Sequence, residues 1–169
     1  MDLCQEKSLE KITLRELLEY TGVAKKTFYN HFNDKLDLIV WIYRRILDDD
    51  DDLISKEGFL TYLTRVYQVA KENKTIFCQA AKMTRYDIFR QEVYNIIYHY
   101  YQTQVAKNQS IRAPADQVKF GIQYCANATA SMFIYWLKAG AHGSAEQQAR
   151  FVVHYMPKEI KESLCIFDV

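Results

Sequence analysis

The chain has 169 residues, of which 49% are hydrophobic, and its charged residues nearly balance at a formal net charge of +1. This length supports a sizeable hydrophobic core, and this composition excludes a disordered chain. No apolar run approaches the roughly 20 residues of a membrane-spanning helix, and no secretory signal follows Met1. With only 5 Gly and 2 Pro, the sequence predicts an all-α cytoplasmic protein with no membrane partner.

The cysteine and histidine residues indicate neither a disulfide framework nor a metal centre. The four cysteines are far apart and form no C-x-x-C pair, which favours buried, reduced thiols. The four histidines form neither an H-x-x-x-H nor an H-E-x-x-H motif. The sequence also lacks a nucleophile elbow, a phosphate-binding loop and paired catalytic carboxylates. We therefore expect no metal, no cofactor and no enzyme activity.

The stretch from Thr13 to Phe32 predicts two short helices joined by a tight turn. Thr13 and Glu16 have the spacing of a capping box, and leucines recur at helical spacing behind them. Gly22 is expected to end the first helix in the left-handed conformation, and the second helix turns Phe28 inward. Two helices joined by a glycine turn form a helix-turn-helix, whose second helix enters the major groove of DNA.

The run T-G-V-A-K-K-T-F-Y-N-H-F-N-D-K-L-D-L at residues 21–38 resembles the DNA-binding signature of the TetR family of bacterial one-component repressors. Its specific part is the T-F-Y-x-H-F core followed by Lys35 and Leu38. The resemblance implies a three-helix helix-turn-helix domain over residues 1–47 and a helical ligand-binding and dimerisation domain over residues 53–169. It also implies a homodimer that binds palindromic double-stranded DNA and is released by a small-molecule effector.

Three features depart from the family pattern. Leu18 stands where alanine is usual, so the two helices are expected to lie slightly farther apart. Ala24 stands where serine usually caps the recognition helix; the loss of such a cap costs about 0.5–2 kcal/mol and leaves the helix start frayed. The helix before the motif is expected to be short or truncated, because residues 1–7 supply only part of what usually precedes the motif.

Basic residues gather on and just after the second helix of the motif. Residues 21–47 carry five Lys or Arg against two Asp, whereas residues 1–20 carry five acidic and three basic side chains. Side chains at the start of a recognition helix reach base edges, and those farther along bind phosphates. Arg15 is included because it matches a family position. The predicted DNA-binding residues are Arg15, Lys25, Lys26, Thr27, Tyr29, Asn30, His31 and Lys35.

The remaining sequence predicts further helices with few breaks. Asn33 is expected to cap the next helix, and the acidic run that starts at Asp48 predicts a domain boundary before Gly58. Ser144 has the spacing of a second capping box, and Pro157 should kink or split the last helix. The expected helices cover residues 34–47, 59–72, 74–83, 86–107, 114–139 and 144–164.

Many of the 13 Tyr and 9 Phe residues fall in the C-terminal part of the chain. Buried tyrosines need partners for their hydroxyls, so polar-tipped rings favour a cavity or a wet interface over a dry core. Core aromatics without a ligand are the simpler alternative. The predicted pocket for an apolar or aromatic effector consists of Tyr67, Phe77, Met83, Tyr94, Tyr98, His99, Tyr124 and Trp136.

The last two long helices have more apolar surface than one face can bury, which favours pairing with a second copy in a four-helix bundle. TetR-like proteins pair in this way, and burial within one subunit is the alternative. The predicted interface consists of Ala126, Ala130, Phe133, Val152, Val153, Met156 and Ile160.

The leading interpretation is a homodimeric transcription repressor. A second interpretation is a dimeric all-helical interaction module of the same fold that has lost DNA binding. The sequence defines neither the operator nor the effector, and it does not separate repression from activation.

Overall fold

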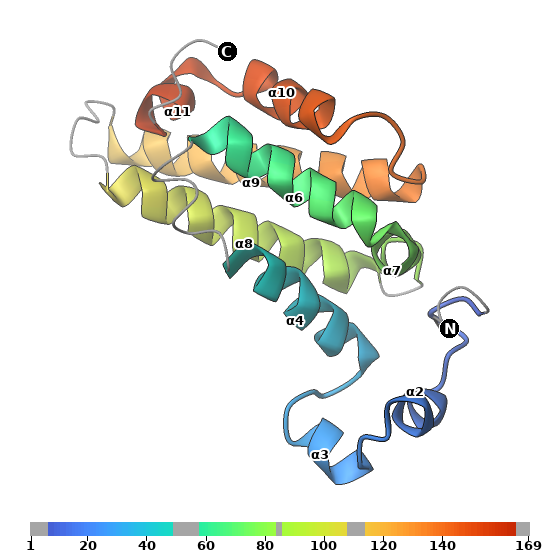
Figure 1. Ribbon diagram of the computed structural model, residues 1–169. Helices are drawn as coiled ribbons and strands as arrows, with labels where there is room; N and C mark the ends of the chain where they lie inside the picture. Colours follow the sequence, from blue (N-terminus) through green and yellow to red (C-terminus); the bar gives the residue numbers. More distant parts are fainter. Residues whose placement is uncertain (1–6, 49–57, 84–85, 108–113, 165–169) are drawn as a thin grey trace.

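The computed structural model describes residues 7–48, 58–83, 86–107 and 114–164, and every regular element in these ranges is a helix (Figure 1). The all-α prediction is therefore confirmed. The helices are α2 (Leu14–Thr21), α3 (Lys25–Tyr29), α4 (Lys35–Asp48), α6 (Phe59–Glu72), α7 (Lys74–Ala80), α8 (Tyr86–Lys107), α9 (Ala115–Lys138), α10 (Ala145–Tyr155) and α11 (Lys158–Ser163).

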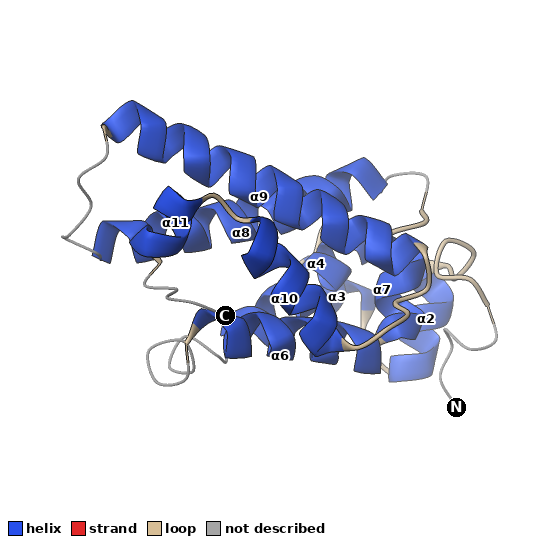
Figure 2. Ribbon diagram, turned by 90° about the horizontal axis from the view of Figure 1, so that it is seen from above, coloured by secondary structure: helices blue, strands red, loops and turns tan. Residues whose placement is uncertain are grey.

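The C-terminal helices pack as a bundle in which α8 lies along α9 and α6 lies along α10 (Figure 1, Figure 2). In α6, apolar residues recur three or four positions apart, which places Leu63, Val66, Tyr67 and Ala70 on its buried face. Phe89 and other aromatic side chains fill the interior between the helices. The bundle thus supplies a rigid support for the smaller helices at one end.

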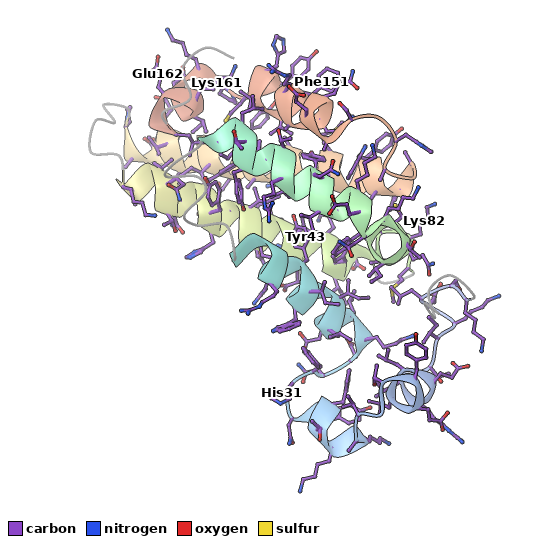
Figure 3. All side chains as sticks on the ribbon, in the orientation of Figure 1. His31, Tyr43, Lys82, Phe151, Lys161 and Glu162 are labelled. Atoms are coloured by element: carbon purple, nitrogen blue, oxygen red, sulfur yellow. The ribbon has the colours of Figure 1, made fainter. Side chains whose placement is uncertain are left out.

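Helix α4 joins the bundle to the helix-turn-helix, which lies below the bundle in Figure 1. Tyr43 of α4 is buried, and its ring contacts those of Phe77, Phe89 and Phe133 at centroid distances of 6.0, 6.2 and 5.6 Å. Figure 3 shows Tyr43 where α4 meets the bundle. The predicted domain boundary falls mostly on residues 49–57, which lie outside the described residues.

The cap of α4 differs from the prediction by one residue. Asp34, not Asn33, accepts the hydrogen bond from the backbone N–H of Asp37, at 2.9 Å. Asn33 instead donates from its backbone and side-chain nitrogens to the Asp37 carboxylate, at 2.9 Å each. Both arrangements satisfy polar groups at the start of the helix, and sequence spacing alone did not separate them.

The end of the bundle is built around Pro157, which separates α10 from α11 as expected. Ser144 caps α10 by accepting a hydrogen bond from the N–H of Gln147 at 3.0 Å. Helix α11 then packs on α9, where Ile160 lies against Gly121 so closely that an added Cβ would be 2.6 Å from its Cδ1 atom. The glycine therefore permits this helix contact.

Candidate nucleic-acid interface

The predicted turn between α2 and α3 is present in its local details. Thr13 and Glu16 form the reciprocal capping box at the start of α2. Gly22 ends α2 in the left-handed conformation with φ of 69°, which glycine adopts without a steric cost. Ala24 precedes α3 and makes no side-chain capping hydrogen bond. The predicted capping box, the predicted glycine turn and the predicted lack of a side-chain cap on α3 are thus confirmed.

Helix α3 is only five residues long, and its buried side chain is that of Phe28. Phe28 is buried, with its ring 5.4 Å from that of Phe32 and 5.6 Å from that of Tyr29. Lys25 and Lys26 at the helix start are exposed, and the Lys25 ammonium lies 5.9 Å from the centroid of the Tyr29 ring. The outward face of α3 is therefore basic and aromatic.

The other predicted contact residues on or beside α3 are also exposed. Thr27, Asn30 and His31 all lie at the surface, and Figure 3 shows His31 at the end of α3, away from the bundle. Arg15 on α2 is exposed as well, but its guanidinium donates to Glu19 at 2.8 Å, and this hydrogen bond raises its pKa. Exposed donors of this kind suit phosphate oxygens and base edges.

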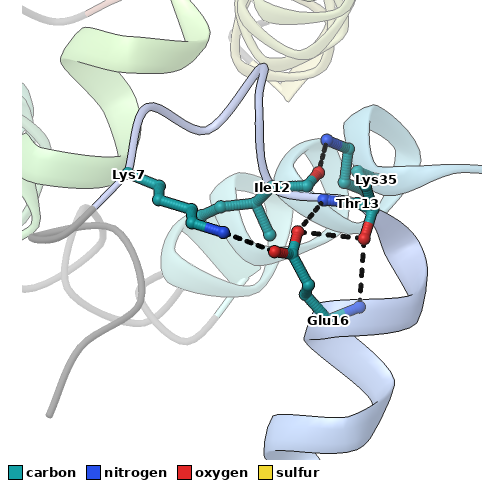
Figure 4. A network of polar contacts seen from close by, with 5 residues as sticks. All are labelled: Lys7, Ile12, Thr13, Glu16 and Lys35. Atoms are coloured by element: carbon teal, nitrogen blue, oxygen red, sulfur yellow. Dashed lines mark hydrogen bonds and ion pairs between the residues drawn. The ribbon is translucent and has the colours of Figure 1, made fainter.

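Lys35 is the exception among the predicted DNA-binding residues. Its ammonium is directed at backbone carbonyls of the segment before α2, including that of Leu9 at 2.9 Å and that of Ile12 (Figure 4). The side chain is partly buried. Lys35 therefore differs from the exposed residues on α3. Its ammonium contacts groups more than 20 residues away along the chain.

The residues predicted to form one effector pocket are spread over the described part of the structure, and two of them, Tyr67 and Tyr124, line the same groove between α9 and α10. Trp136 is buried and its indole N–H donates to the His142 carbonyl at 2.7 Å, so its polar group is already satisfied within the protein. Tyr94 and Tyr98 stack on each other along α8 at 5.7 Å. The remaining predicted residues split by burial: Phe77 is fully buried, Met83 is partly buried, and His99 and Tyr124 are exposed.

A small cavity does lie among other aromatic side chains of the core, and of the predicted residues only Tyr67 lines it. Its volume is about 30 Å³, which holds about two water molecules. Tyr101 and Thr129 form a 3.1 Å hydrogen bond beside it, and burial raises the pKa of both Tyr67 and Tyr101. The lining also includes Tyr43 of α4, so the cavity touches the helix that leads to the DNA-binding surface.

Six of the seven side chains predicted to face a second copy are buried within the subunit. Small residues such as Ala126 and Ala130 are fully buried on the side of α9 that packs inside the bundle. The others share this burial, except for the half-buried Val152. The full predicted set was Ala126, Ala130, Phe133, Val152, Val153, Met156 and Ile160.

Large apolar side chains lie exposed on the opposite side of the same two helices. On α10 they include Tyr155, which is 78% exposed, and Phe151, which Figure 3 shows on the outward side. A groove of about 290 Å³ runs between α9 and α10 among them. On α9, Phe120, Tyr124 and Met132 are separated by multiples of four residues, which places them along one side of the helix. The exposed apolar face comprises Phe120, Tyr124, Met132, Tyr135, Phe151 and Tyr155.

No helix in the described parts of the chain is both long and apolar enough to cross a membrane.

Comparisons with known proteins agree with this geometry. The family model described as "Bacterial regulatory proteins, tetR family" matches residues 1–40, and the model described as "Transcriptional regulator C-terminal region" matches residues 57–158. Comparison with curated proteins gives no match. The solved structure of the "Dihydroxyacetone kinase operon activator DhaS" is similar, with a TM-score of 0.65 at 18% identity over 99% of this chain and 93% of that chain. At this identity the likeness shows a shared fold. The chain belongs to the TetR family of DNA-binding bacterial transcriptional regulators.

Proposed function

We propose that the protein is a homodimeric transcription repressor of the cytoplasm that binds a palindromic operator through α3 and is released by a small effector. The observation that carries this proposal is the exposed basic and aromatic face of α3, which stands at the end of α4 away from the bundle (Figure 1, Figure 3). Family membership supports DNA binding and the regulation of transcription.

In this proposal α3 enters the major groove with its first residues nearest the bases. Lys25 and Lys26 donate to guanine O6 and N7 or to phosphates, and the Tyr29 ring contacts a thymine methyl group. Thr27 and His31 bind phosphates and thereby set the register of the helix. Two copies then require half-sites about one helical turn apart.

The second copy is expected to cover the exposed apolar face of α9 and α10. Tyr135 and Tyr155 are 71% and 78% exposed, and aromatic side chains of this size are typical of the centre of a protein interface. Because both helices contribute, a twofold pairing forms a four-helix bundle. The groove between α9 and α10 gives such a partner a place for its own side chains.

The effector is proposed to enter the aromatic cavity beside Tyr43. The cavity of about 30 Å³ must expand to hold an organic molecule, and expansion would move Tyr43 and with it α4. A ligand shifts such an equilibrium only when it binds one state better than the other. We therefore expect the effector to favour the expanded state, in which the two copies of α3 no longer fit one duplex.

The DNA-binding part of the proposal is tested with duplexes selected from a random pool. Lys25→Ala and Tyr29→Ala should each weaken binding by about ten-fold or more, with no change in the thermal midpoint. Lys82→Ala, an exposed lysine next to α7, is the matched control and should bind like the wild type. If both α3 variants also bind like the wild type, α3 does not read DNA. If the wild-type protein selects no duplex, the interaction-module alternative is favoured.

The dimer is tested by sedimentation equilibrium. Tyr135→Glu places a charge in the exposed apolar face and should shift the protein to monomers, because an unpaired buried charge is costly at an interface. Gln102→Glu, at an exposed position of α8, makes the same charge change elsewhere and should leave the assembly intact. A wild-type monomer at all concentrations would refute the dimer.

The effector is tested by thermal shift with a panel of small aromatic compounds. A true effector should raise the thermal midpoint and also weaken operator binding. Val66→Ile, which adds one methylene to the cavity lining from α6 without expanding it, should weaken the first response and spare operator affinity. A reporter gene behind the operator then separates repression from activation. A panel that changes neither stability nor operator affinity would contradict ligand control.

A further inference from the structure

The ammonium of Lys35 lies against the end of a single helical turn that precedes α2. In this turn the N–H groups of Lys11 and Ile12 donate to the Ser8 carbonyl at 2.9 and 3.1 Å. The carbonyls at the end of such a turn have no partners within it, and a cation is favoured there. Lys35 supplies this cation from the first residue of α4, 23 or more positions away along the chain.

The same turn is fixed on its other side by the bundle. Leu9 and Ile12 are 8% and 2% exposed, so both side chains are held in the interior. The backbone N–H of Leu9 donates to the side-chain oxygen of Gln79 in α7. The turn is therefore held between α4, through Lys35, and α7, through Gln79.

One peptide group connects this arrangement to α2. Its carbonyl belongs to Ile12 and accepts from the Lys35 ammonium, whereas its N–H belongs to Thr13 and donates to the Glu16 carboxylate at 2.8 Å (Figure 4). Thr13 is the residue that caps α2, and Glu16 also pairs with Lys7. Lys35 thus fixes the point at which α2 begins relative to α4.

The placement of α3 depends on the two helices beside it. A five-residue helix is too short to be stable alone, and α3 also lacks a side-chain cap at Ala24. Its position is set by α2 before it and α4 after it, and Lys35 connects α4 to the segment that leads into α2. Loosening that connection would let α3 rotate away from the orientation that suits the groove.

We propose that Lys35 is a positioning residue, which holds α2 and α4 in the relative placement that presents α3 to DNA, and that it does not bind phosphate. This inference rests on the proposed DNA-binding function of α3. It differs from the role that the position of Lys35 in the family signature implies, because the ammonium is already engaged by backbone carbonyls.

The two roles predict different salt dependence. Each phosphate contact contributes about 0.9 to the slope of log K against log salt. Lys35→Met should weaken operator binding by about ten-fold at every salt concentration, which gives a line parallel to that of the wild type. Lys26→Met, which removes an exposed lysine of α3, is the matched control and should lower the slope by about one. Both are measured well below the thermal midpoint, so that only folded protein contributes.

Two results would overturn the proposal. A reduced slope for Lys35→Met would make Lys35 a phosphate contact, and an unaltered affinity of the folded variant would make it a merely structural residue. If Lys35→Met does not fold, Lys35→Arg replaces it. Arginine preserves a phosphate contact but fits poorly between carbonyls that surround a compact ammonium, so a parallel loss supports positioning and full affinity refutes it.

Failure of the proposed function is recognised separately. If the wild-type protein binds no selected duplex, the DNA-binding role of α3 fails, and hydrogen exchange decides the role of Lys35. Lys35→Met should then speed exchange at the Thr13 amide by about ten-fold, whereas Lys26→Met should not. Equal exchange rates in the two variants would refute the link between Lys35 and α2.

Discussion

The guanidinium of Arg44 in α4 lies 2.7 Å from the carboxylate of Glu92 in α8, so an ion pair connects the helix after the DNA-binding surface to the bundle. The two side chains are 53% and 30% exposed. A cleft of about 330 Å³ lies beside the pair and also contacts His31 and Trp41. Tyr43, the preceding residue of α4, makes a buried contact with the same bundle. Helix α4 is therefore attached to the bundle by one buried and one partly exposed contact.

Removing this ion pair should have a small effect that depends on salt. Glu92→Gln is expected to lower the free energy of unfolding by at most about 1 kcal/mol, because the pair is partly exposed to solvent and screened by ions. Urea unfolding at low and high ionic strength measures the loss, which should shrink at high salt. A double-mutant cycle with Arg44→Ala isolates the pair. A loss of equal size at both ionic strengths would contradict this account.

The capping network of α2 should respond to acid. Hydrogen bonds from Lys7 and then from Thr13 lower the pKa of Glu16 from 4.5 to about 2. Because the folded-state pKa is the lower one, ionised Glu16 stabilises the fold above pH 4.5, and this contribution is lost as the pH falls toward 2. The difference in thermal midpoint between wild type and Glu16→Gln should therefore shrink over this range. An NMR titration of Glu16 with a midpoint near 4.5 would disprove it.

The missing cap of α3 can be restored. Ala24 has the extended backbone of a capping residue, with φ of −66° and ψ of 140°, but no side-chain oxygen. Ala24→Ser should stabilise the protein by about 0.5–2 kcal/mol, since serine can accept a hydrogen bond from an N–H group in the first turn. Chemical denaturation measures the gain. Ala24→Val, which adds bulk without an oxygen, is the control, and an equal gain from valine would rule out capping as the cause.

The buried hydrogen bond between Tyr101 and Thr129 gives a prediction about the core. Thr129→Val leaves the tyrosine hydroxyl buried without this partner and should cost about 1–3 kcal/mol. Adding Tyr101→Phe removes the second polar group as well, so the double variant should recover part of the loss. Equilibrium unfolding of the two single variants and the double variant measures the coupling. Strict additivity of the two single losses would show that the bond contributes nothing to stability.

The parts of the fold that the sequence predicted well depend on short-range signals. The capping box of Thr13 and Glu16, the glycine at position 22 and Pro157 each act on backbone groups within one or two helical turns. Their backbone consequences follow from local sterics and hydrogen bonding, whatever the rest of the chain does. The helix-turn-helix and the break between α10 and α11 could therefore be located from the residues alone.

The features that the sequence did not predict depend on long-range packing. Helix α9 is apolar on two sides, and periodicity does not say which side meets its own subunit. Ala126 and Ala130 proved to be internal, because small side chains let α9 lie close to its neighbour. The carbonyls that the Lys35 ammonium contacts lie 23 or more positions away along the chain, so no local pattern predicts this contact. Aromatic content likewise does not determine the volume of a cavity.

The contact between Gly121 and Ile160 makes the last described helix sensitive to a single substitution. Alanine at position 121 would bring its methyl carbon within 2.6 Å of the isoleucine, far inside the normal separation of two carbon atoms. Helix α11 has only six residues, so it is expected to lift from α9 rather than to compress. The cleft of about 200 Å³ beside Pro157 and Phe120 would then widen, and the margin of the exposed apolar face would change shape with it.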